Sequence, residues 1–167
     1  MKDQKIRKLI FAAMLAALVT VATMLVKIPS PTNGYVNLGD CFVLLAGWLL
    51  GPWYGAASAG IGSMLTDLLS GYPYYAPASF LIKGLDAMLA SLLYTALKPR
   101  RIALPLSGIA GELFMTAGYF GYTALLLGRG LTAALSIPGN LVQGGVGIIV
   151  AILLMQLAKR AHLAEKI

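Results

Sequence analysis

Apolar segments separated by short turns occupy most of the chain. They cover residues 9–26, 38–50, 53–69, 78–97, 102–127 and 137–158. A transmembrane helix needs about 20 apolar residues, so six helices with short connections use nearly all of the 167 residues. The pattern predicts an all-α integral membrane protein, a six-transmembrane-helix bundle in which residues 1–167 form a single transmembrane domain. The second segment is short, and we expect it to begin within the preceding loop.

Proline and glycine mark the turns between these segments. Pro29, Pro31 and Asn33-Gly34 predict a loop after the first segment. Gly51-Pro52 predicts a tight turn before the third segment, and Pro138 is a favourable first-turn residue for the sixth helix.

The composition agrees with the membrane class. Hydrophobic residues make up 59% of the chain and charged residues 11%, against about 25% charged residues in a typical soluble domain. The net charge of +7 comes mainly from basic residues in the turns and tails, so we expect no nucleic-acid partner and a lipid bilayer as the surroundings.

The basic residues predict the orientation of the bundle. Four precede the first segment, three lie between the fourth and fifth, and three follow the sixth. With six spans these three regions fall on one side, and basic residues favour the cytoplasmic side. Both termini are therefore predicted to be cytoplasmic. The residues concerned are Lys2, Lys5, Arg7, Lys8, Lys98, Arg100, Arg101, Lys159, Arg160 and Lys166.

Sequence signatures of catalysis and of metal binding are missing. The single cysteine, Cys41, cannot form an internal disulfide or a multi-cysteine metal site. The single histidine, His162, lies in the polar tail, so histidine or zinc chemistry inside the membrane is disfavoured. No phosphate-binding loop or common hydrolase motif occurs. We expect no enzyme activity, no metal and no cofactor, and an energy source outside this chain.

Polar side chains inside the apolar segments are the functional candidates, because ionisable groups are costly in a bilayer. Lys83 and Asp86 are three residues apart and share a helix face. Glu112 lies near the middle of the fifth segment. With the loops that precede the second and fourth helices, these groups predict an outward-facing cavity for a small, flat, polar molecule. The predicted substrate-binding residues are Asn37, Asp40, Tyr74, Tyr75, Lys83, Asp86, Glu112, Tyr119, Asn140 and Gln143.

Each candidate also has a structural interpretation. In the structural interpretation, Lys83 does no more than neutralise Asp86 or Glu112. Asp40 and Asp67 fit helix caps or interfaces, and the tyrosines of the third loop fit an interfacial aromatic belt. A structural or assembly membrane protein without a ligand is therefore the alternative from another class, and an intramembrane enzyme is a weak third.

Small residues form stripes on the first helix. Two overlapping pairs, Ala12/Ala16 and Ala13/Ala17, have the small-xxx-small spacing that lets helices approach closely in lipid. These four alanines are the predicted partner-binding residues, and packing within the bundle is the alternative.

Several residue strings resemble one membrane family. They lie at residues 7–17, 34–40, 50–55, 66–72, 80–85 and 138–144. In their order and spacing the chain resembles, over essentially its whole length, the S components of energy-coupling-factor (ECF) transporters. These are the small membrane subunits that capture vitamins and related micronutrients.

The resemblance implies a partner set and a role. It implies a multi-pass protein of the prokaryotic plasma membrane that docks on a membrane-spanning coupling subunit, with the alanine motif of the first helix as a contact. Two ATP-binding-cassette ATPases would supply the energy for import. We favour pyridoxine or hydroxymethylpyrimidine as the vitamin or vitamin precursor, because such a ring can use Glu112, Asn140 and Gln143 together. Riboflavin is the alternative within this class.

Overall fold

The computed structural model describes residues 2–29 and 35–162 and consists mainly of six α-helices. Each helix overlaps a predicted apolar segment, and the predicted all-α bundle is observed. The largest differences are at the start of α1, seven residues early, and at the end of α5, six residues early. The helices are α1 (Lys2–Leu25), α2 (Asp40–Leu50), α3 (Pro52–Leu69), α4 (Ala76–Leu97), α5 (Ala103–Gly121) and α6 (Ile137–Arg160).

The connection between α1 and α2 contains more structure than the predicted loop. Strand β1 (Lys27–Pro29) pairs antiparallel with β2 (Tyr35–Asn37), so that Lys27 lies opposite Asn37. Three-residue strands are too short to show an alternating pattern in the sequence. The predicted turn residues Pro31 and Asn33-Gly34 lie outside the described residues.

The connection between α5 and α6 is helical rather than extended. A π-helical segment, η1 (Tyr122–Leu126), continues α5, and a 3-10 helix, η2 (Gly130–Ser136), leads into α6. The predicted fifth segment therefore ends as an α-helix at Gly121 and continues as η1, whose backbone hydrogen bonds follow another pattern.

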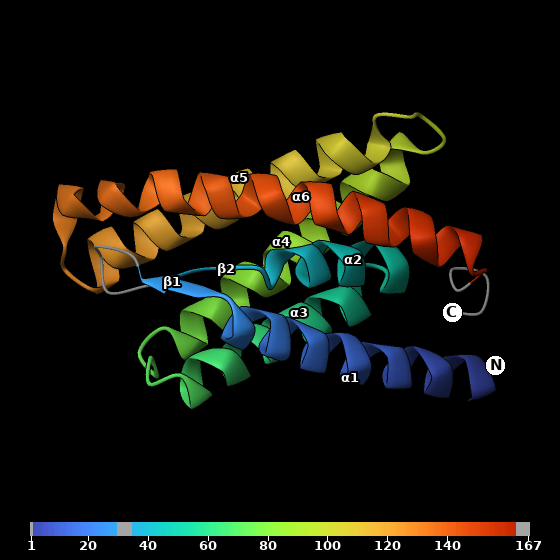
Figure 1. Ribbon diagram of the computed structural model, residues 1–167, viewed down its shortest axis with the longest axis horizontal. Coiled ribbons are helices and arrows are strands. Elements are labelled where there is room, and N and C mark those ends of the chain that lie inside the picture. The colour runs from blue at the N-terminus through green and yellow to red at the C-terminus, as the bar shows by residue number, and fades with distance from the viewer. Residues whose placement is uncertain (1, 30–34, 163–167) are drawn as a thin grey trace.

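Three helical stretches within the described residues are long and apolar enough to cross a membrane. They are Gln4–Leu25, Ala76–Leu97 and Gly130–Arg160. Helix α2 differs from them because its 11 residues extend only about 16 Å, roughly half the apolar thickness of a bilayer. It is buried along nearly its whole length and lies among α1, α3, α4 and α6 (Figure 1). The bundle therefore shields α2 from lipid.

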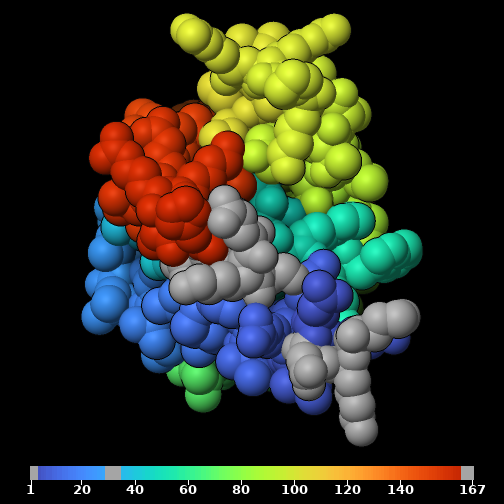
Figure 2. Space-filling model, turned by 90° about the vertical axis from the view of Figure 1, so that its right-hand side faces the viewer, coloured from blue at the N-terminus to red at the C-terminus, as the bar shows by residue number. Residues whose placement is uncertain are grey.

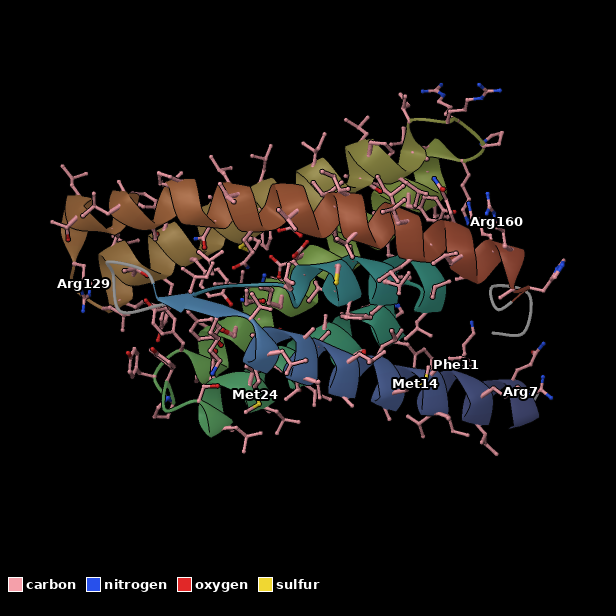
Figure 3. All side chains as sticks on the ribbon, viewed as in Figure 1. Arg7, Phe11, Met14, Met24, Arg129 and Arg160 are labelled. Atoms are coloured by element: carbon pink, nitrogen blue, oxygen red, sulfur yellow. The ribbon has the colours of Figure 1, made fainter. Side chains whose placement is uncertain are left out.

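The basic regions gather at one end of the bundle. Figure 1 shows both ends of the chain there, with the paired strands at the opposite end. Arg7 and Arg160 lie at this terminal end, and Arg129 lies at the other end (Figure 3). The view onto the terminal end shows the start of α1 in blue, the α4–α5 connection in yellow and the end of α6 in red (Figure 2). The fold thus brings together the three basic regions that the sequence separates.

Glycine and alanine allow the inner helices to approach closely. A side chain at Gly62 of α3 would come within 2.5 Å of the Ala16 carbonyl oxygen of α1. Ser58 of α3 also donates a hydrogen bond to the Ala12 carbonyl at 2.8 Å. Ala12 and Ala16 are therefore buried against α3, whereas Ala13 and Ala17 are exposed on the outer face of α1. The two alanine pairs have different surroundings.

Candidate functional site

A pocket opens at the end of the bundle that carries the strands. It encloses about 620 Å³ of empty space, which includes space open to solvent. Side chains from all six helices contribute to its wall, together with β2, η1, η2 and the residue before α4. The lining residues are Thr23, Tyr35, Asn37, Asp40, Ser63, Asp67, Tyr75, Ser79, Lys83, Tyr119, Thr123, Ser136, Asn140 and Gln143.

An ion pair lies at the base of this pocket. The Lys83 ammonium of α4 contacts Asp40 Oδ1 at the start of α2, and both side chains are at most 4% exposed. Gln143 of α6 donates to the second carboxylate oxygen of Asp40 at 2.6 Å. The direct salt bridge of Lys83 is therefore with Asp40, and neither Asp86 nor Glu112 forms one with it among the described residues.

The polar network continues from this ion pair to β2. The backbone N–H of Asn37 donates to Gln143 Oε1 at 2.7 Å. The side-chain oxygen of Asn37 accepts from the Gly39 N–H at 2.7 Å, next to the start of α2. Asn37 and Gln143 are 106 residues apart in sequence, so the network fixes the first connection against α6. Asp40 is part of this network and makes no side-chain capping bond at α2.

Three tyrosines form the aromatic part of the wall. The rings of Tyr75 and Tyr119 are 6.3 Å apart in an edge-on arrangement, and the Lys83 ammonium lies 5.7 Å from the centre of the Tyr119 ring. The Tyr119 hydroxyl shares a hydrogen bond of 2.7 Å with Ser79, and Tyr75 pairs with Thr123 at 3.2 Å. These bonds hold the ring planes in place, as stacking against a flat ligand requires.

The third tyrosine, Tyr35, lies on β2 beside the end of α3. Its hydroxyl donates a hydrogen bond to Asp67 Oδ1. Burial, and then the Asp67 carboxylate, raise the pKa of Tyr35 well above its ordinary value. Tyr35 therefore stays a neutral donor. The second oxygen of Asp67 is buried and has no hydrogen-bond partner among the described residues.

The structure brings together seven of the ten predicted substrate-binding residues in the pocket wall. Tyr74, Asp86 and Glu112 lie outside this wall. Tyr74 lies in the turn before α4, 44% exposed, with its ring 5.1 Å from that of Tyr75. The seven residues in the wall are Asn37, Asp40, Tyr75, Lys83, Tyr119, Asn140 and Gln143.

Asp86 and Glu112 lie deeper in the bundle than the pocket. Asp86 is one turn beyond Lys83, and Glu112 is two turns, about 10 Å, from Tyr119 along α5. Glu112 packs on Gly144 of α6, and neither carboxyl group has a hydrogen-bond partner among the described residues. No group of acidic, histidine or cysteine side chains in the described part of the chain could hold a metal ion.

Sequence reasoning missed half of the pocket wall. Asp67 was interpreted as a cap or interface residue, yet its carboxylate lines the pocket. The other missed residues are small hydroxyl side chains and one loop tyrosine, which occur in any membrane helix or loop. Among these missed residues, only Asp67 could have been singled out from the sequence, because it is an ionisable residue near the end of a helix. The missed residues are Thr23, Tyr35, Ser63, Asp67, Ser79, Thr123 and Ser136.

Comparisons with known proteins agree with this fold. The family described as "ECF-type riboflavin transporter, S component" matches residues 3–160. A solved structure described as "Structure and mechanism of the S component of a bacterial ECF transporter" superposes with a TM-score of 0.73 at 26% identity. It covers 93% of this chain and 97% of that one.

Two curated relatives cover most of the chain. The thiamine precursor transporter HmpT of Lactococcus lactis subsp. cremoris (strain MG1363) is 32% identical over 162 residues, which are 96% of this chain and 92% of the relative. An uncharacterized protein of Pyrococcus woesei is 34% identical over 139 residues, 78% of this chain and 93% of the relative.

The fold and these matches show that the chain is a membrane transport subunit. The chain belongs to the family of ECF-type riboflavin transporter S components. It is therefore a substrate-capture subunit of vitamin uptake and a membrane protein, as the sequence predicted, and it associates with ECF partners. The family is one of transporter subunits rather than enzymes.

Proposed function

We propose that the pocket captures a small nitrogen-containing ring, with hydroxymethylpyrimidine favoured and pyridoxine second. The observation that carries this proposal is the composition of the wall: eleven polar or charged residues and three tyrosines, with no aliphatic side chain among them. Such a wall suits a ligand with polar groups on most of its edges and a flat face for stacking. The likeness to a thiamine precursor transporter supports the same choice.

Riboflavin fits this wall less well, although it gives the family its name. Its dimethylbenzene edge is apolar, and the wall offers no aliphatic side chain to pack against it. Burying the polar groups of the wall without hydrogen bonds is unfavourable. Riboflavin therefore remains the alternative ligand within the class.

The direction of capture follows from charge. The terminal end carries the three basic regions, and basic residues favour the cytoplasmic side. We infer that both termini are cytoplasmic, that all six helices lie in the prokaryotic plasma membrane, and that the pocket opens outward. The partners would be a membrane-spanning coupling subunit and two ATP-binding-cassette ATPases, which supply the energy that this chain lacks.

The outer face of α1 is the docking surface that we propose for the coupling subunit. Ala13 and Ala17 are exposed there, four residues apart, and leave room for a close helix contact. Ala12 and Ala16 already pack against α3. Ala13 and Ala17 are therefore the better candidates for an intermolecular contact.

Mass spectrometry of the purified protein tests the capture role. The chain would be purified in detergent and denatured, and any released compound identified. We expect a pyrimidine or pyridine vitamin precursor in an amount close to that of the protein. Release of riboflavin would overturn the choice of ligand. A protein that releases nothing and binds none of the three compounds in titration would favour the structural alternative.

A further inference from the structure

Asp67 is the one charged group of the described pocket wall that forms no salt bridge. The other two charged residues there, Lys83 and Asp40, form an ion pair with each other. No other salt bridge within 4 Å occurs among the described residues. Lys27, the nearest other basic residue along the first connection, donates its hydrogen bond to Ser70 and lies over the Tyr35 ring at 5.3 Å.

The two carboxylate oxygens of Asp67 differ in their hydrogen bonding. Tyr35 donates to Oδ1, while Oδ2 is buried without a partner, and the whole residue is 3% exposed. The nearby Ser79 hydroxyl is bonded to Tyr119 at 2.7 Å. A buried carboxylate oxygen without a hydrogen bond is unfavourable, because it has lost its water and gained nothing in exchange. A ligand that supplies a donor at this point removes that cost.

We propose that Asp67 is the specificity-determining residue of the pocket and selects heterocycles that present an N–H group to Oδ2. This inference rests on the proposed function and names the class of ligand more closely. An ionised carboxylate only accepts hydrogen bonds. An exocyclic amine or a protonated ring nitrogen therefore binds it, and a carbonyl oxygen at the same position is repelled. Bonds to a charged acceptor are stronger than neutral ones.

The same charge excludes anionic forms of the ligand. With Lys83 paired to Asp40, the wall carries one net negative charge when Asp67 is ionised. A phosphate monoester carries a charge of about −1.5 to −2 at neutral pH and finds no free cation among the described wall residues. The pocket therefore selects the unphosphorylated alcohol over its phosphate ester and disfavours ring carboxylates.

Titration calorimetry of the full chain in detergent tests this selection on the unaltered protein. The probes are hydroxymethylpyrimidine, its O-methylated oxo analogue, in which a methoxy group replaces the exocyclic amine so that no ring N–H is present, and its phosphate monoester. Because a hydrogen bond to a charged group is involved, we expect the amine to bind roughly 10- to 100-fold more tightly than the methoxy analogue. The phosphate ester should bind more weakly than the free alcohol by at least a similar factor.

The variant Asp67→Asn sharpens this test. Its amide oxygen can keep the hydrogen bond from Tyr35, so that its N–H₂ group faces the ligand instead of Oδ2. We expect the preference to fall or to reverse in favour of the methoxy analogue. Asp86→Asn is the matched control, because it makes the same change at a buried carboxyl outside the pocket wall. Its ratio of the two affinities should equal that of the unaltered protein.

The outcomes separate this inference from the proposed function. Equal affinity of the unaltered protein for the amine and the methoxy analogue, or for the alcohol and its phosphate ester, overturns selection by Asp67 and leaves the capture role standing. An unchanged preference in Asp67→Asn does the same. Binding of riboflavin with no binding of any pyrimidine overturns the proposed ligand itself.

Discussion

The two ends of the bundle are built from the same helices by different means. At the terminal end, α2, α4 and α6 contribute Trp48, Tyr94 and Met155 to an apolar cluster. At the other end the same three helices contribute Asp40, Lys83 and Gln143 to the polar pocket wall. Each helix thus changes from an apolar core segment to a polar site segment within a few turns.

The difference between these ends concerns how they are held together. The apolar cluster relies mainly on close packing of side chains, with isolated hydrogen bonds such as that of 3.0 Å from the Trp48 indole to Ser107. The pocket end relies on hydrogen bonds between distant parts of the chain, such as Gln143 to Asp40 across 103 residues. A ligand can replace water in such a polar frame, whereas a packed apolar core leaves no room for one.

Removal of the pocket cation should give the largest effect. Lys83→Met leaves the Asp40 carboxylate buried without its counter-ion, which costs about 3–5 kcal/mol. We expect a large fall in the unfolding midpoint in detergent. The double variant Asp40→Asn/Lys83→Met removes the stranded charge and should recover much of the loss. Equal destabilisation by the single and the double variant would contradict the compensation of Lys83 by Asp40.

A methyl group at the tightest helix contact should destabilise the molecule less. Gly47 of α2 lies against the backbone of Ala87 of α4, so Gly47→Ala should cost about 1–3 kcal/mol through overpacking. Gly145 of α6 faces open space, and Gly145→Ala should be neutral or slightly stabilising. Thermal unfolding in detergent compares the two variants. A Gly47→Ala protein as stable as Gly145→Ala would show that the helices can separate without cost.

A smaller effect is expected for an amide of the pocket wall. No hydrogen bond among the described residues involves the Asn140 side chain, although it lines the pocket. Asn140→Ala should therefore weaken binding of hydroxymethylpyrimidine by about 0.5–1.5 kcal/mol, the net contribution of one hydrogen bond, with stability unchanged. Glu112→Gln, outside the wall, should leave the affinity unchanged in titration. A larger loss of affinity for Glu112→Gln than for Asn140→Ala would place the ligand site deeper in the bundle.

The smallest effect on the isolated protein is expected on the outer face of α1. Ala17→Leu should change stability by less than about 0.5 kcal/mol and leave ligand binding intact, while reducing co-purification with the coupling subunit. Ala12→Leu should instead destabilise the chain itself, because Ala12 is buried against α3. Full co-purification of the Ala17→Leu protein would place the docking surface elsewhere.

The sequence allowed the apolar end and the helices to be predicted more fully than the site. Apolar runs and Gly-Pro turns are local features, so the helix containing Trp48 and the turn at Gly51 could be expected from neighbouring residues. The pocket depends on contacts between residues far apart, such as Asn37 with Gln143. Tyr35 and Asp67 gave no local indication that they would meet. Glu112 was chosen because charge inside an apolar helix suggests function. It lies outside the pocket wall, packed on Gly144, and its part in binding stays a prediction.

Equilibrium titration of the purified chain alone, without coupling subunit or ATPases, with hydroxymethylpyrimidine tests the central claim most directly. The polar, tyrosine-lined pocket lies wholly within this chain, so the account predicts saturable binding of one ligand per protein. Saturable binding of riboflavin with no heat from hydroxymethylpyrimidine or pyridoxine would contradict it.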